Sequence, residues 1–177
     1  MQPLTCPIPS NLNPLQSNGF LFTINKLPEI SFFCQEANLP SLGLPNATQS
    51  TSLADIMHPG DKLSFGELSI TFLIDGEMRN YQAVSDWMMG LGFPRQHEQF
   101  TSWINQHRTF PTDGDGSASV SDGVLQILNA SNLPLKTIMF RDLFPTTLNS
   151  LQLQTTSGET MYLAGNATFA YTLYEFN

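Results

Sequence analysis

The residues best suited to chemistry lie in the stretch SFFCQEANLPSLGL, from Ser31 to Leu44. It places the thiol of Cys34 two positions before the carboxylate of Glu36, and such a pair could provide a nucleophile or metal ligands. No CxxC pair and no neighbouring histidine accompany this cysteine, so neither a zinc site nor an activated thiol is indicated.

The sequence offers a simpler interpretation of Cys34. It alternates with Ile30 and Phe32, as residues on one face of a strand do, and a lone cysteine is most often a small buried residue. The only other cysteine is Cys6, and two cysteines do not make a disulfide framework.

A second candidate for chemistry is the stretch DGDGSASVSDG, from Asp113 to Gly123, which looks like the start of a calcium loop. Alternating Asp and Ser oxygens suit a hard cation. The loop lacks a glutamate at its twelfth position and carries a further aspartate out of register, so a surface turn is favoured.

The remaining titratable residues show no catalytic spacing. The histidines His58, His97 and His107 are far apart and form no HExxH motif, so they are interpreted as surface or interface residues. No GxSxG elbow and no phosphate-binding glycine loop with lysine is present. We therefore expect no catalytic residue, no cofactor and no metal site.

The composition points to a protein surrounded by neighbours. Charged residues make up 12% of the 177, roughly half the usual share, so much of the surface is expected to be covered by other chains. Fifteen acidic residues against seven basic ones give a net charge of −8, which argues against gripping nucleic acid.

The length fits one domain, expected over residues 18–177, with residues 1–17 as an extended Pro-, Asn- and Ser-rich arm. The start of the chain has no basic and apolar signal-peptide pattern, and no stretch reaches the roughly 20 apolar residues of a membrane span. A soluble protein made in the cytoplasm is expected, with its three N-x-S/T sequons as by-products of composition.

Alternating apolar residues predict mostly strands. Residues 20–24 and 30–34 are expected to pair as a hairpin, followed by a long polar connector at about 44–62 that contains the short apolar patch LADIMH. Further strands are predicted at 68–74, 124–129 and 135–141, with a long last strand over 161–173 bent at Gly165.

Two segments change to a helical period. Residues 77–91 place Tyr81, Val84, Met88 and Leu91 on one stripe flanked by Trp87, and residues 100–107 suggest a shorter helix. The expected fold class is therefore α+β: an antiparallel β-sandwich or half-barrel with one main flanking α-helix.

Three blocks, in this order, resemble tail tube proteins of contractile-tailed bacteriophages, relatives of pyocin and type VI secretion tubes. The first block, at 20–44, resembles the family's opening hairpin followed by its Cys-x-x-Ala-x-x-Leu-Pro step, here Cys34, Ala37, Leu39 and Pro40. The second, at 60–88, matches a Gly-Asp, strand, acidic turn and helix that ends in Asp86 and Trp87. The third, at 140–176, matches an aromatic-Pro-Thr ending that includes Phe144 and Pro145.

The resemblance implies rings of six subunits whose sheets join edge to edge into a continuous inner β-barrel, stacked into a tube around a DNA channel. The implied partners are further copies of the chain, with the tail sheath and the baseplate or tail-terminator proteins. DNA would pass without specific binding, no membrane would be involved, and the protein would reside in the virion after assembly in the host cytoplasm.

Within this interpretation the connector reaches a neighbouring ring, and its expected contact residues are Leu53, Asp55, Ile56, Met57 and His58. The segments before residue 19 and over 93–123 have no counterpart in the family pattern, which leaves a tube initiator or terminal ring protein of the same fold as an alternative. A monomeric β-sandwich module that binds carbohydrate or calcium is the alternative from a different class, and a hydrolase is a more distant one.

Overall fold

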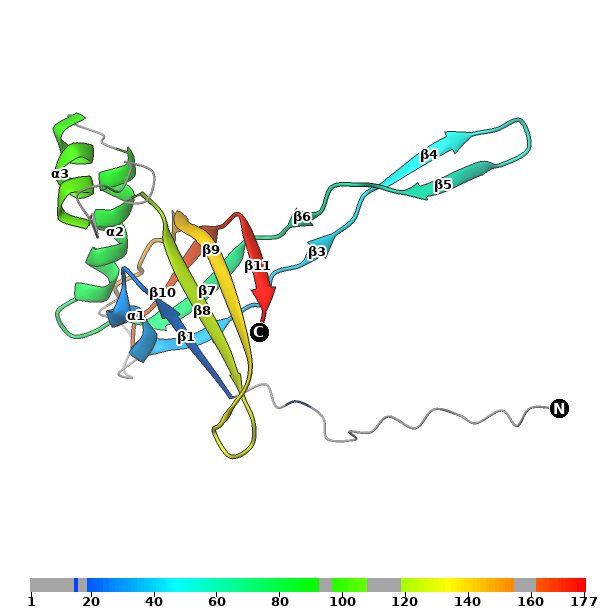
Figure 1. Ribbon diagram of the computed structural model, residues 1–177. Helices are drawn as coiled ribbons and strands as arrows, with labels where there is room; N and C mark the ends of the chain where they lie inside the picture. Colours follow the sequence, from blue (N-terminus) through cyan, green and yellow to red (C-terminus); the bar gives the residue numbers. More distant parts are fainter. Residues whose placement is uncertain (1–14, 16–18, 93–96, 108–118, 155–161) are drawn as a thin grey trace.

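A computed structural model of the chain describes residues 15, 19–92, 97–107, 119–154 and 162–177. Strands form a curved sheet in the middle of the molecule, two helices lie against one side, and a long hairpin projects from the other (Figure 1). The helices are α1 (Pro28–Phe33), α2 (Arg79–Gly92) and α3 (His97–His107). None of the described helices is long and apolar enough to cross a membrane.

The strands fall into one large sheet and two small ribbons. The large sheet contains β1 (Phe20–Ile24), β2 (Cys34–Ala37), β7 (Leu68–Leu73), β8 (Ser121–Leu128), β9 (Pro134–Leu148), β10 (Ala164–Ala170) and β11 (Leu173–Phe176). The ribbons are β3 (Leu42–Gly43) with β6 (Ser64–Phe65), and β4 (Asn46–Ser50) with β5 (Asp55–Pro59).

The large sheet has the order β1-β8-β9-β10-β7-β2, with β11 beside β9, and every described pairing in it is antiparallel. Strand β9 is long enough to belong to both halves of this sheet. Sheet A comprises β1, β8, β11 and the first part of β9; sheet B comprises β2, β7, β10 and the last part of β9, from Phe144 to Leu148. The expected α+β half-barrel with a main flanking helix is confirmed, and the described strands do not close it into a barrel.

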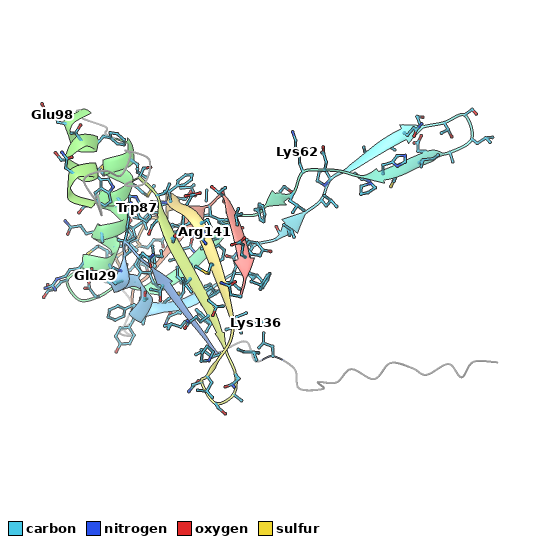
Figure 2. All side chains as sticks on the ribbon, in the orientation of Figure 1. Glu29, Lys62, Trp87, Glu98, Lys136 and Arg141 are labelled. Carbon is cyan, nitrogen blue, oxygen red and sulfur yellow. The ribbon has the colours of Figure 1, made fainter. Side chains whose placement is uncertain are left out.

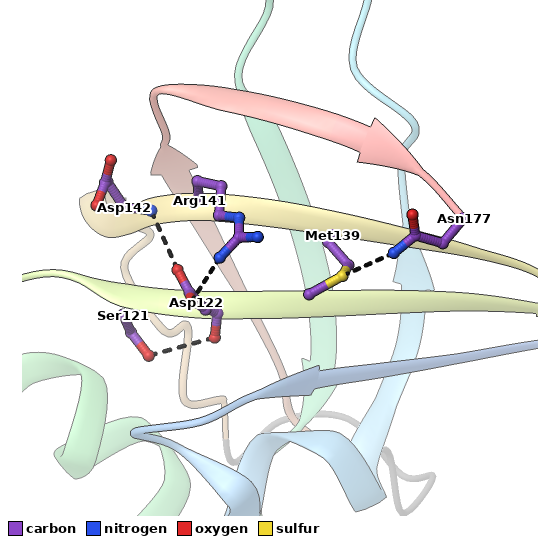
Figure 3. A network of polar contacts seen from close by, with 6 residues as sticks. All are labelled: Ser121, Asp122, Met139, Arg141, Asp142 and Asn177. Atoms are coloured by element: carbon purple, nitrogen blue, oxygen red, sulfur yellow. Dashed lines mark hydrogen bonds and ion pairs between the residues drawn. The ribbon is translucent and has the colours of Figure 1, made fainter.

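The bend between the two sheets lies at Asp142, whose φ of 55° is unusual for a residue with a side chain. Asp122 in the neighbouring strand holds this bend: its Oδ1 accepts a hydrogen bond from the Asp142 backbone N–H at 3.4 Å (Figure 3). Its Oδ2 lies 3.7 Å from Nη1 of Arg141. The register also shifts here, between Ser121 and Gly123 of β8, so both strands turn together.

The core forms between the two sheets and helix α2. Alternate residues of β7, namely Leu68, Ile70 and Phe72, are fully buried, as the period of two predicts. Helix α2 contributes the buried side chains of Val84 and Trp87 to the same core. The helix predicted at 77–91 is confirmed, but Trp87 lies at the centre of its buried stripe rather than beside it.

The predicted hairpin of residues 20–24 with 30–34 is wrong. Strand β1 pairs with β8, β2 pairs with β7, and the segment between them forms helix α1. Pro28 at the first turn suits a helix start, and Leu27 and Ile30 are both buried at the i, i+3 spacing of a helical turn. The alternation that suggested a strand was too short to separate the two periods.

The predicted single last strand is also wrong, because it breaks into β10 and β11 at residues 171–172. The break follows from β9: where β9 bends at Asp142, its partner must bend as well, and Thr172 N–H donates to Arg141 O at 3.0 Å. Gly165 lies inside β10, where an added Cβ would come 3.0 Å from Cζ of Phe72. Glycine there makes room for a core ring instead of bending the strand.

Other predicted elements are confirmed. The strands expected at 68–74, 124–129 and 135–141 correspond to β7, β8 and β9, and the shorter helix corresponds to α3. The expected arm at 1–17, except Leu15, and most of the calcium-like stretch, residues 113–118, lie outside the described residues.

Candidate functional site

Cys34 does not have the environment of a reactive thiol. It starts β2, is half-buried against the core, and its Sγ donates to Glu36 O at 3.5 Å. Burial raises the pKa of this thiol to about 11. The thiol is therefore protonated at neutral pH, in agreement with its interpretation as a packing residue.

The described residues contain no group of three or more His, Cys, Asp or Glu side chains that could hold a metal. His58 lies in β5, where its Nε2 is 3.2 Å from Gln49 Oε1 on the facing strand. His97 and His107 are the first and last residues of α3. The exposed surfaces of the described residues are therefore considered as the candidate site.

The most conspicuous surface is the projecting hairpin formed by β4 and β5, with β3 and β6 as its stem (Figure 1). Every residue of β4 and β5 is exposed. Leu53, at the turn, is 96% exposed, and Met57 is 69% exposed. A two-stranded ribbon without a core is marginally stable alone, and exposed apolar side chains along it favour a protein partner.

This hairpin contains all the residues expected to contact a neighbouring ring. Asp55, Ile56, Met57 and His58 belong to β5, and Leu53 belongs to the preceding turn. The structure therefore brings them together on one projection. The sequence indicated a connector, but it did not indicate strands, because a fully exposed ribbon has no alternation of burial.

An aromatic cluster fixes the root of the hairpin to the body. Phe65 of β6 makes edge contacts with Tyr171 and Tyr174, at centroid distances of 6.1 and 5.6 Å. The Tyr171 hydroxyl donates to Gly66 O at 2.8 Å, and burial, with a smaller effect of Tyr174, raises its pKa to about 12. Phe140 of β9 completes the cluster, 5.1 Å from Tyr171. Sequence reasoning missed this cluster because it joins segments more than 100 residues apart.

Within the described part of the chain, sheet B has two edges that no strand pairs with. No described strand pairs with the outer side of β2. Strand β8 pairs with β9 only as far as Leu143, so the last part of β9 has β10 on one side and no described strand on the other. Asn38 N–H donates to Ser69 O of β7, so the backbone N–H of Ala37, one residue earlier, points to the open side. Unpaired backbone groups of this kind are templates for another strand.

The family-motif residues occupy structural positions around this sheet. Ala37 pairs with Ile70, Pro40 is buried, and Leu39 is 47% exposed just beyond β2. Asp86 is exposed on α2. Three motif residues lie elsewhere in the sheet or the core: Trp87, Phe144 and Pro145.

Trp87 is fully buried, and its Nε1–H donates to Ser119 O at 3.1 Å. In β9, Phe144 and Pro145 lie opposite Ala170 and Phe169 of β10, at the start of the unpaired edge.

Unpaired sheet edges and a projecting hairpin with exposed apolar side chains are typical of proteins that assemble with further chains. A family model described as phage tail tube protein matches residues 4–177, and the chain belongs to that family. The resemblance seen in the sequence is thereby confirmed at the level of the family.

Solved structures share the fold at low sequence identity. A chain of the tube-terminating cap of the anti-feeding prophage aligns with a TM-score of 0.59 and 14% identity, covering 98% of this chain and 97% of that one. A chain of the sheath-tube complex of the PVC extracellular contractile injection system, in its extended state, gives a TM-score of 0.58 and 11% identity over 93% and 91%. A search of curated proteins found no match.

Proposed function

We propose that this protein is a structural subunit of a phage tail tube, without catalytic activity. Six copies form a ring through their sheet edges, and rings stack into a tube whose channel passes DNA. Residues 18–177 form the single domain of this subunit and residues 1–17 an arm. It resides in the virion after assembly in the host cytoplasm, with the sheath and the baseplate or terminator proteins as partners.

The observation that carries the proposal is the arrangement of strands in sheet B. Its four strands are antiparallel throughout, so β2 and the last part of β9, at opposite edges, run in opposite directions. Rotation about a ring axis preserves strand direction along that axis, so β9 of one copy would meet β2 of the next as an antiparallel partner. The sheet can therefore continue from copy to copy without a break in its pattern.

The hairpin supplies the contact along the tube. Leu53, Asp55, Ile56, Met57 and His58 lie on a projection that its own chain does not cover, so an adjacent ring can bury them. Contacts that repeat along an axis without closing produce a filament, as a tube requires. Low charge on the chain fits this scheme, because copies of the chain cover much of each surface.

Ring formation is tested by removing a single edge donor. Replacing Ala37 with proline removes the outward N–H of β2 while leaving its bonds to β7, so a folded monomer that forms no rings is expected. Ala37→Val is the matched control, because it enlarges the side chain but keeps the donor. Normal rings from Ala37→Pro in negative-stain micrographs, with an unchanged melting curve, would contradict edge pairing at β2.

Stacking is tested separately by deleting Ser50 to His58. The body should still fold and form rings, but the rings should not extend into tubes. Normal tubes from the deleted protein would refute the role of the hairpin.

A second candidate function is a ring at one end of the tube, and the aligned chain of a tube-terminating cap favours considering it. Purified full-length protein that forms single rings but never long tubes would support this alternative. A stable monomer with a calcium-dependent melting shift would instead support a binding module.

A further inference from the structure

A groove beside the last residue of β9 lies on the same side of sheet B as helix α2. It has a volume of about 420 Å³, and its lining residues are Tyr81, Ser85, Met88, Met89, Gly92 and Leu148. None of these residues is charged, and Met89 is 51% exposed. The Tyr81 hydroxyl donates to Asn149 O at 3.1 Å, so the start of α2 is held against the end of β9. The groove is therefore an uncharged continuation of the unpaired β9 edge.

The groove and helix α1 lie on opposite flanks of α2. With about 3.6 residues per turn, the groove residues Tyr81, Ser85 and Met88 form one stripe along the helix. Ala83 and Asp86 lie on the other flank, where they line a separate cavity together with residues of α1. The buried stripe of α2 lies between the two flanks. The chain's own α1 thus packs beside one flank of α2, and none of the described elements fills the groove on the other.

Helix α1 is on the same face of sheet B as α2. Its residue Ile30 is fully buried in the core, and the helix contacts both β7 and α2. It ends at Phe33, directly before Cys34 starts the edge strand β2. In a ring closed through β2 and β9, β2 of the next copy lies beside β9. Helix α1 of that copy is then on the same face as α2 and on the flank that holds the groove.

The strand register places α1 and the groove at the same end of sheet B. One row across the sheet contains Leu148, Ala167, Ile70 and Ala37. Cys34 and α1 therefore lie beyond this row in the direction of Asn149, which is also where α2 begins. Rotation about a ring axis keeps this end in the same position along the axis in every copy. The α1 helix of the next copy is therefore level with the start of the groove.

Two further observations favour α1 over other elements as the occupant. A ring is wider outside its barrel wall than at the wall, so the outer parts of neighbouring copies spread apart. An element joined directly to the edge strand remains closest to the junction, and no residue separates α1 from β2. Phe33 is half-buried and Glu29 is exposed on α1 (Figure 2), so the helix offers apolar surface with a charge at its margin. Methionine side chains, such as Met88 and Met89, adapt well to such a partner.

We propose that this groove receives helix α1 of the next copy, so that α2 is held between its own α1 and its neighbour's. The proposal rests on the proposed ring. Strand β2 has four residues, and an edge strand directs only about half of its backbone groups outwards, so strand pairing alone gives a short junction. The helix contact adds burial of apolar side chains outside the barrel wall.

The contact is tested by cross-linking assembled protein. Glu29→Cys and Met89→Cys are combined in one full-length chain, with Cys6→Ser and Cys34→Ala, and a short bis-maleimide is added. Glu29→Cys with Asp86→Cys is the matched control, because these two residues line the same cavity within one chain.

We expect the first pair to give a ladder of covalent species up to the hexamer on a denaturing gel, since each chain is linked to the next. The control pair should remain monomeric. Absence of the ladder from particles with intact rings would overturn the helix contact and leave the tube function standing. A parent protein that forms neither rings nor tubes would overturn both.

The energetic role of the groove is tested by placing a charge in it. Met89→Lys should raise the protein concentration needed for ring formation about tenfold, because a cation would be buried against α1 of the next copy. Gln82→Lys is the matched control, since it adds the same charge on the exposed side of α2. Ring formation at equal concentrations of both variants would overturn the proposal. A lower melting temperature of monomeric Met89→Lys, with unchanged ring formation, would show that the chain fills its own groove and would also overturn it.

Discussion

Trp87 shows how much a single side chain can connect in this fold. Its ring is fully buried, 6.3 Å from Phe169 of β10, and Lys26 Nζ lies 5.7 Å from the ring centroid. Its N–H reaches Ser119, just before β8. The helical period placed Trp87 on α2, but none of these partners could be predicted, because each depends on how distant segments pack.

Cys34 gives a prediction that concerns one titrating group. With a pKa of about 11, roughly one thiol in a thousand is ionised at pH 8, against about one in ten at the usual value near 9. In a Cys6→Ser variant, alkylation by iodoacetamide at pH 8 should therefore be about 100-fold slower in the folded protein than in urea. The rate should rise about tenfold per pH unit up to pH 11.

The raised pKa also fixes the sign of a stability effect. Between pH 9 and 11 the folded protein holds the Cys34 proton more tightly than the unfolded chain, so this group lowers stability as pH rises through that window. A Cys34→Ala variant should lack this part of the alkaline loss in urea titrations. If stability falls with pH in the same way in both proteins, the pKa of Cys34 is not raised in the folded chain, and the prediction is wrong.

Among the elements, the projecting hairpin depends most on its attachment. The ribbon has no core, so its direction is set at the root, where Phe65 packs among Tyr171, Tyr174 and Phe140. One neutral hydrogen bond, from Tyr171 to Gly66, joins the C-terminal region to this root.

Tyr171→Phe should remove that bond without changing the ring packing. We expect a loss of about 1 kcal/mol in the free energy of unfolding and faster proteolysis within the hairpin, because its root is less restrained. Urea denaturation and limited proteolysis would measure the two effects. Tyr174→Phe is the control, since the contacts that place Tyr174 in the cluster are made by its ring; equal proteolysis of both variants would contradict the role of the hydroxyl.

The same elements show what the sequence could and could not predict. Strand β7 and helix α2 were predictable, because long periodic patterns report burial directly. The pairing of β1 with β8 was not, since it joins residues about 100 positions apart and short alternation also fits a helical turn. The candidate contact residues were predicted as a set, but their presentation on a ribbon was not.

For the whole molecule, the low charge predicts how assembled particles respond to salt. Backbone edges and apolar side chains provide the proposed contacts, and neither is strongly screened. The protein concentration at which particles form should therefore change by less than about threefold between 50 and 500 mM NaCl. Sedimentation would measure it, and dissolution at high salt would indicate that ion pairs hold the copies together.

The bend of β9 has a mechanical consequence. One continuous backbone runs through both sheets, so a force applied to sheet B at a junction passes into sheet A along covalent bonds as well as through side-chain packing. Peeling the sheets apart would require rupture of the hydrogen bonds on both sides of β9 at once. If sheets A and B instead had two separate strands in place of β9, the sheets could slide past each other. A particle built from subunits with one continuous β9 should therefore resist shear along its length.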